Sequence, residues 1–148
     1  MKNPSSVQAP LTNMSSSETS TVSLYELVKK LQGSLLPQTN SRKSFIVNDI
    51  DKSLLVPAEE NTLAYIVGNL LSHAVYRTSC CCIWIETVCV AGQHHIRIRN
   101  NGAFAFSSYK NSLVHFVDVA RKLGGHIGLE KGEKAGVTVV LSMAKIAA

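Results

Sequence analysis

The stretch Glu59–Thr78, EENTLAYIVGNLLSHAVYRT, decides the fold, because it is the longest segment of the chain with a helical period. Its apolar residues recur three and four positions apart: Leu63, Ile66, Val67, Leu70, Leu71, Ala74 and Val75. Side chains at that spacing lie on one face of an α-helix. The sequence therefore predicts a central amphipathic helix that begins after Pro57 and ends near Thr78.

A shorter helix is predicted upstream of this segment. Residues 23–26, Ser-Leu-Tyr-Glu, have the form of a capping box, in which the serine hydroxyl and the Glu26 carboxylate satisfy backbone donors at a helix start. Helical spacing continues through four apolar residues: Leu24, Leu27, Val28 and Leu31. We expect Gly33 to end this helix in a left-handed conformation. The segments 44–50 and 54–56, rich in β-branched and large apolar residues, then predict two strands.

Downstream of the central helix, the sequence predicts a β-hairpin, a third helix and a final pair of strands. The hairpin comprises residues 81–90 and 94–100 with a turn at 91–93. The third helix is marked by Leu113, Phe116, Val117 and Ala120, and it ends at Gly124-Gly125; the last strands are 127–129 and 137–143. The order αββαββαββ favours a two-layer α/β (α+β) sandwich, with helices on one face of the sheet and the other face comparatively open.

Composition indicates one globular domain. The chain has 148 residues, of which 45% are hydrophobic and 17% charged. Residues 1–22 are dominated by Ser, Thr, Asn and Pro, which predicts a flexible tail or linker, and residues 23–148 form the predicted domain. The net charge of +5 is scattered along the chain, so no nucleic-acid partner is expected.

The cysteines and the hydropathy pattern indicate a cytoplasmic protein without a membrane span. Residues 80–82 are consecutive cysteines, whose neighbouring Cα atoms, about 3.8 Å apart, are too close for the usual disulfide. We expect reduced thiols and, without the CxxC spacing, no metal ligands. No apolar stretch approaches the roughly 20 residues that a bilayer span requires.

Three segments, in this order, resemble the ATP-binding domain of histidine kinases, whose superfamily includes gyrase B and MutL. Residues 59–78 resemble the N-box helix, and residues 96–102, IRIRNNG, resemble the strand and loop of the first glycine box. Residues 119–143, VARKLGGHIGLEKGEKAGVTVVLSM, resemble the closing helix, Gly-Gly turn and strand pair. The resemblance runs from about Val22 to Met143. It implies a histidine-kinase-like ATPase fold, with a mixed, mainly antiparallel sheet covered on one face by three helices.

The same segments supply the candidate site. Asn69 and His73 are four residues apart, so they lie on one side of the predicted helix, at the edge of its apolar stripe. In the second hairpin strand, alternation places Asn100 on the core-facing side with Ile96 and Ile98, and places His95, Arg97 and Arg99 on the other side. The resemblance implies a remnant nucleotide-binding site of five residues: Asn69, His73, Arg77, Asn100 and Gly102.

The chain departs from the family pattern within this site. Asn100 stands where the family has an adenine-binding carboxylate, and His73 stands where an asparagine holds magnesium, although Mg²⁺ prefers oxygen ligands. Phe104 replaces the second glycine of the first box, and residues 110–112 contain no glycine. Only ten residues separate Gly102 from Leu113, which leaves little room for a lid. We therefore expect weak ATP or ADP binding, doubtful Mg²⁺ binding, and no catalytic or metal-ligating residue.

Simpler interpretations of these residues remain open. Polar residues beside an apolar stripe are also typical of an ordinary helix boundary, and residues 100–102 are also typical of a turn that leaves a strand. The face of Arg97 and Arg99 is either a solvated sheet face or a docking face for a partner.

These observations favour a degenerate member of the family that acts as a regulatory or docking module in two-component signalling. Its expected partner is a protein: a kinase, a response regulator or a second copy in a homodimer. One alternative is the functional ATP-binding catalytic domain of a sensor histidine kinase, whose phosphoacceptor lies in another segment or chain. Others are a stand-alone serine kinase of the anti-sigma-factor type, and an interaction module that binds no nucleotide.

Overall fold

The computed structural model describes residues 21–101, 111, 113–122, 124–131 and 136–143. Along the chain, the helices and strands are β3 (Thr21–Ser23), α1 (Leu24–Ser34), α2 (Leu36–Ser41), β4 (Phe45–Asn48), β5 (Leu55–Pro57), α3 (Glu60–Arg77), β6 (Cys82–Val90), β7 (Gln93–Asn100), the 3₁₀ turn η1 (Val114–Phe116), α5 (Val117–Lys122), β8 (His126–Lys131) and β9 (Val137–Ser142). Apart from β3, α2 and η1, this order is the predicted αββαββαββ. Most of the predicted tail lies outside the described residues.

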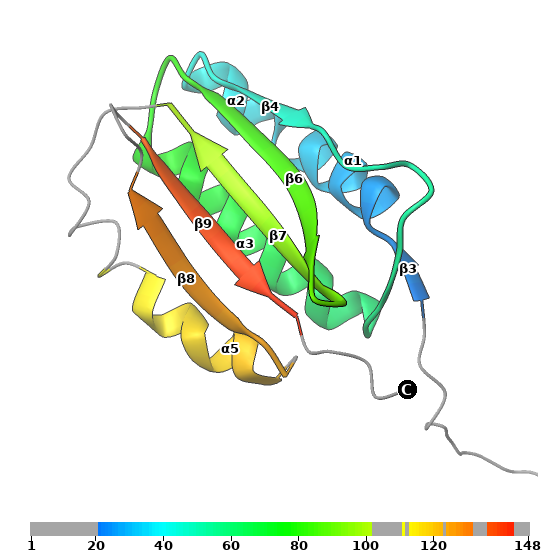
Figure 1. The fold of residues 1–148 in the computed structure, drawn as a ribbon. Helices are drawn as coiled ribbons and strands as arrows, with labels where there is room; N and C mark the ends of the chain where they lie inside the picture. The colour runs from blue at the N-terminus through cyan, green and yellow to red at the C-terminus, as the bar shows by residue number, and fades with distance from the viewer. Residues whose placement is uncertain (1–20, 102–110, 112, 123, 132–135, 144–148) are drawn as a thin grey trace, which may run out of the picture.

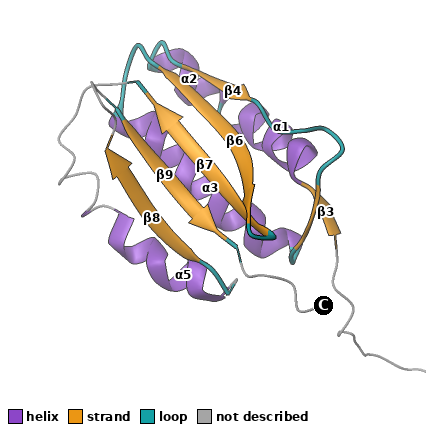
Figure 2. Ribbon diagram, viewed as in Figure 1, coloured by secondary structure: helices purple, strands orange, loops and turns teal. Residues whose placement is uncertain are grey.

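The described elements form two layers. Five strands pair in the order β4-β6-β7-β9-β8; β4 is parallel to β6, and the other neighbours are antiparallel. The helices lie on one side of this sheet, and α3 crosses behind its centre, while the other face is open (Figures 1 and 2). The predicted sandwich, with a mixed and mainly antiparallel sheet, is confirmed. None of the described helices is both long and apolar enough to cross a bilayer.

Helix α3 forms the centre of the hydrophobic core. All seven residues of its predicted apolar stripe are buried. They pack in one cluster with buried side chains of the sheet: Ile83, Ile85, Ile96, Ile98, Val139 and Leu141. Glu59 begins the helix, because its carboxylate accepts hydrogen bonds from the N–H groups of Asn61 and Thr62 at 3.0 and 2.9 Å. The amphipathic pattern therefore fixes which face of α3 meets the sheet.

The β6–β7 hairpin has the predicted alternation, but Gln93 pairs with Val90 and belongs to β7, so the turn is one residue shorter than predicted. Its two-residue turn consists of Ala91 and Gly92, whose φ angles are 52° and 78°, as required by a tight type I′ turn. The register pairs Ile83 with Asn100 and Glu86 with Arg97. Because side chains alternate along a strand, Asn100 shares the helix-facing side of β7 with the buried Ile96 and Ile98.

The N-terminal region differs from the prediction in two places. Ser23 accepts a hydrogen bond from the Glu26 N–H at 3.3 Å, as expected of a helix cap, but regular structure begins earlier, at Thr21. Strand β3 pairs with β5 in a separate two-stranded sheet, which buries Val22. The predicted left-handed cap at Gly33 is wrong. The helix continues to Ser34, and a second helix with a proline in its first turn follows directly, so the chain needs no left-handed residue there.

Candidate functional site

Asn100 ends strand β7 in a closely packed environment. Its side chain is buried, with 3% of the residue exposed, and its Nδ2 donates a hydrogen bond to the backbone oxygen of Val137 at 3.4 Å. Gly136 packs against the backbone of Asn100: a Cβ atom on Gly136 would lie 2.0 Å from the Asn100 carbonyl oxygen. The position of the Asn100 side chain is therefore set by the junction of β7 and β9.

Asn69 and His73 lie one turn apart on α3, as predicted, and both are half-buried. The Asn69 Nδ2 donates a hydrogen bond to the backbone oxygen of Tyr65 at 2.6 Å, so this amide group is turned back onto its own helix. The His73 ring packs edge-on against Phe116 of η1, with 6.3 Å between ring centroids and an interplanar angle of 85°. The structure thus brings His73 together with an aromatic residue that sequence reasoning had assigned only to a helix core.

Of the other two predicted site residues, one is exposed and one lies outside the described residues. Arg77 is the last residue of α3, and its side chain is exposed. Gly102 lies outside the described residues, as do Phe104 and the segment in which the shortened lid was inferred. The described part of the candidate site is therefore Asn69, His73 and Arg77 on the helix layer and Asn100 on the covered face of the sheet.

The open sheet face carries Arg97 and Arg99, as predicted, but sequence reasoning missed the network of side chains that pairs with them. Arg97 forms a two-pronged hydrogen bond with Glu130, at 2.8 and 3.3 Å. This contact lowers the pKa of the Glu130 carboxyl and raises the pKa of the Arg97 guanidinium. The guanidinium of Arg99 lies 4.5 Å from the centre of the Trp84 ring. Because Arg97 and Glu130 are far apart in sequence, only the pairing of β7, β9 and β8 brings them together.

The cysteines do not form disulfides in the structure. Cys81 and Cys82 are buried, whereas Cys80 and Cys89 are exposed. Burial raises the pKa of the Cys82 thiol. Among the described residues, no group of three or more His, Cys, Asp or Glu side chains is arranged to hold a metal ion.

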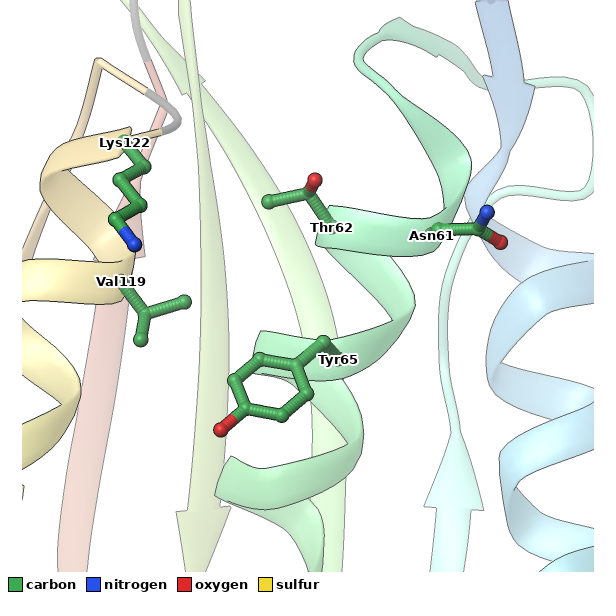
Figure 3. Close-up of a pocket in the computed structure, with 5 residues that line it drawn as sticks. All are labelled: Asn61, Thr62, Tyr65, Val119 and Lys122. Carbon is green, nitrogen blue, oxygen red and sulfur yellow. The ribbon is translucent and has the colours of Figure 1, made fainter.

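A pocket of about 400 Å³ lies between α3 and α5, where five residues line it: Asn61, Thr62, Tyr65, Val119 and Lys122 (Figure 3). None of the predicted site residues is among them. Sequence reasoning missed this pocket because its walls come from helices separated by two strands in the chain. The sequence feature that could have indicated the pocket was Tyr65, a large aromatic residue that lies one turn before Asn69 but outside the apolar stripe.

The chain has the fold of the ATP-binding catalytic domain of histidine kinases. It is similar to the catalytic domain of histidine kinase ThkA, with a TM-score of 0.73 and 18% identity, over 86% of this chain and 96% of that domain. The ATP-binding domain of PrrB from Mycobacterium tuberculosis gives a TM-score of 0.65 and 15% identity, over 87% and 98% of the two chains. ThkA in complex with the response regulator TrrA gives a TM-score of 0.71 and 16% identity, over 86% of this chain and 42% of that one. The sequence matches no protein-family model and no curated protein.

Proposed function

We propose that this chain is a nucleotide-binding module of the histidine-kinase type, with impaired ATP turnover and a regulatory or docking role in two-component signalling. The fold supports the general class. The observation that carries the specific proposal is that His73 packs against Phe116; by the sequence resemblance, His73 takes the position of the magnesium-binding asparagine. An imidazole held there makes a poor substitute for an oxygen ligand of Mg²⁺.

Asn100 is the residue that we assign to contact adenine. Asn100 is buried on the covered face of the sheet, beside the helix layer, and its amide nitrogen is directed to the Val137 carbonyl. The carbonyl oxygen of the same amide is an acceptor of the kind that the adenine amino group requires. The amide has no negative charge, so the hydrogen bond to adenine is weaker than one made to a carboxylate. We infer that Asn100 binds the adenine base with reduced affinity.

Magnesium does not fit the described residues. The Asn69 Nδ2 donates to the Tyr65 backbone oxygen, which leaves Oδ1 as one neutral oxygen, and His73 offers nitrogen rather than oxygen. Mg²⁺ prefers near-octahedral oxygen coordination, to which these two side chains contribute one oxygen at most. We therefore assign no phosphoryl-transfer step to this chain, and we infer that a bound nucleotide acts as a signal.

A protein partner would recognise the nucleotide-bound form of the chain. The response regulator bound to ThkA supports a partner from the same signalling class, and a kinase or a second copy of the chain are the other candidates. The partner would recognise the nucleotide-bound and nucleotide-free forms differently, because a ligand changes a protein's behaviour only through such a difference in affinity.

Calorimetric titration with ADP and a non-hydrolysable ATP analogue, with and without Mg²⁺, tests the proposal. We expect micromolar binding that Mg²⁺ changes less than twofold and that Asn100→Ala weakens at least tenfold. Asn40→Ala, at an exposed position of α2, is the matched control and should bind as the wild type does. Asn100→Asp should tighten binding, and His73→Asn should make it dependent on Mg²⁺.

The main alternative, an active catalytic domain, predicts other results. Binding by the wild type would then require Mg²⁺, and the chain would phosphorylate a histidine-containing substrate domain supplied in trans. Magnesium-dependent binding would refute the absence of a Mg²⁺ site, and phosphorylation would refute impaired turnover. No nucleotide binding by a folded wild-type chain would leave only a docking role.

A further inference from the structure

The pocket between α3 and α5 is a hollow that is widely open to solvent and has room for a small molecule. Tyr65 and Thr62 extend from α3 towards α5, Val119 and Lys122 face them from α5, and Asn61 points away (Figure 3). The volume of about 400 Å³ lies within the range of ordinary ligand pockets. A ligand in this pocket would therefore contact two side chains from each helix.

Most of the pocket wall is apolar. The Thr62 hydroxyl is bound to the Glu59 carboxylate, so the threonine turns its methyl group towards α5. Val119 contributes two further methyl groups from the other side. Tyr65, whose residue surface is 57% exposed, presents its aromatic ring to this hollow. A flat apolar ligand would remove this surface from water.

Lys122 supplies a positive charge at the rim of the pocket. It forms no ion pair with any described carboxylate, whereas the neighbouring Arg121 is paired with Asp118 at 2.7 Å. Glu59, the acidic residue beside the pocket, accepts hydrogen bonds from the Thr62 hydroxyl and from the N–H groups of Thr62 and Asn61, and these bonds lower the pKa of its carboxyl. Lys122 is therefore the available partner for an anionic group of a ligand.

We propose that this pocket binds a small aromatic carboxylate, whose ring packs between Tyr65 and Val119 and whose carboxylate pairs with Lys122. This site is separate from the proposed nucleotide site. Tyr65 precedes His73 by eight residues, which is about 12 Å along an α-helix. The two sites use different side chains of the same helix, although Asn69 of the nucleotide site lies one turn from Tyr65 and donates its Nδ2 to the Tyr65 backbone oxygen.

Titration followed by two-dimensional NMR, with indole-3-carboxylate and its neutral isostere indole-3-carboxamide, tests this proposal. The carboxylate should shift the amide signals of Tyr65 and Val119 and bind about fivefold more tightly than the carboxamide, as expected for one exposed ion pair. Lys122→Gln should remove this preference, whereas Arg121→Gln, the adjacent cation, should keep it. Tyr65→Ala should weaken both ligands, and Tyr76→Ala, a similarly exposed tyrosine of α3, should weaken neither.

The proposal is overturned by equal affinities of the two ligands for the wild type, by equal losses in Lys122→Gln and Arg121→Gln, or by displacement of the carboxylate by ADP. Displacement would mean that the pocket belongs to the nucleotide site. Failure of nucleotide binding would not affect this test, because the titration monitors the amide signals of Tyr65 and Val119 rather than that of Asn100. Binding of an acidic peptide but of neither indole would assign the pocket to a protein partner and refute a small-molecule ligand.

Discussion

Replacement of Gly136 by alanine should destabilise the fold at the edge of the candidate nucleotide site. The φ angle of Gly136 is +96°, where a Cβ atom costs roughly 1–2 kcal/mol. That Cβ would also lie 2.0 Å from the Asn100 oxygen and 3.2 Å from the Asn101 Cα, which are backbone atoms of the adjacent chain segment. Moving these backbone atoms adds an overpacking cost of about 1–3 kcal/mol, so we expect the free energy of unfolding to fall by about 2–5 kcal/mol in total.

Differential scanning calorimetry measures this loss. For a chain of this length, 1 kcal/mol lowers the midpoint of unfolding by about 3 °C, so Gly136→Ala should lower it by about 6–15 °C. Gly128→Ala is the matched control, because a Cβ on Gly128 of β8 meets no atom within 4 Å, and its effect should stay within about 0.5 kcal/mol. A midpoint for Gly136→Ala within about 2 °C of the wild type, or equal losses in the two variants, would refute the described contact between Gly136 and Asn100.

Three further predictions concern other parts of the fold. Leu71→Ala removes a fully buried side chain of α3 and should cost about 2–5 kcal/mol in urea unfolding, with an unchanged m-value. Ser23→Ala removes the oxygen that accepts the Glu26 N–H and should cost about 0.5–2 kcal/mol in the same assay. Glu130→Gln should cost less than about 1 kcal/mol at pH 7, because the Glu130 side chain, 55% exposed, pairs with Arg97 at the sheet surface. Since folding lowers the pKa of Glu130 from its ordinary value of 4.5, this difference from the wild type should shrink as the pH falls below 4.5; a constant difference from pH 7 to pH 3 would contradict it.

Local patterns were sufficient for most of the secondary structure. The spacing of the apolar residues between Leu63 and Val75 identified α3 and its buried face, because the helical period of 3.6 residues is a property of the backbone. The strand period of two similarly identified the covered side of β7, and hence the burial of Asn100. The prediction of a cap at Gly33 was wrong because the end of α1 depends on the helix that follows it. The short strand β3 was missed because its partner β5 lies 34 residues away.

The sequence alone determined the order of the elements, the residues of α3 that face the core and the motifs that resemble a histidine-kinase ATP-binding domain. The tertiary structure alone decided which side chains from distant segments meet: His73 with Phe116, Arg97 with Glu130, and Tyr65 with Val119 and Lys122 across a pocket. The physical reason is that periodicity reports how one element is oriented relative to the core. Contacts between elements depend on the register and packing of segments that no local pattern specifies.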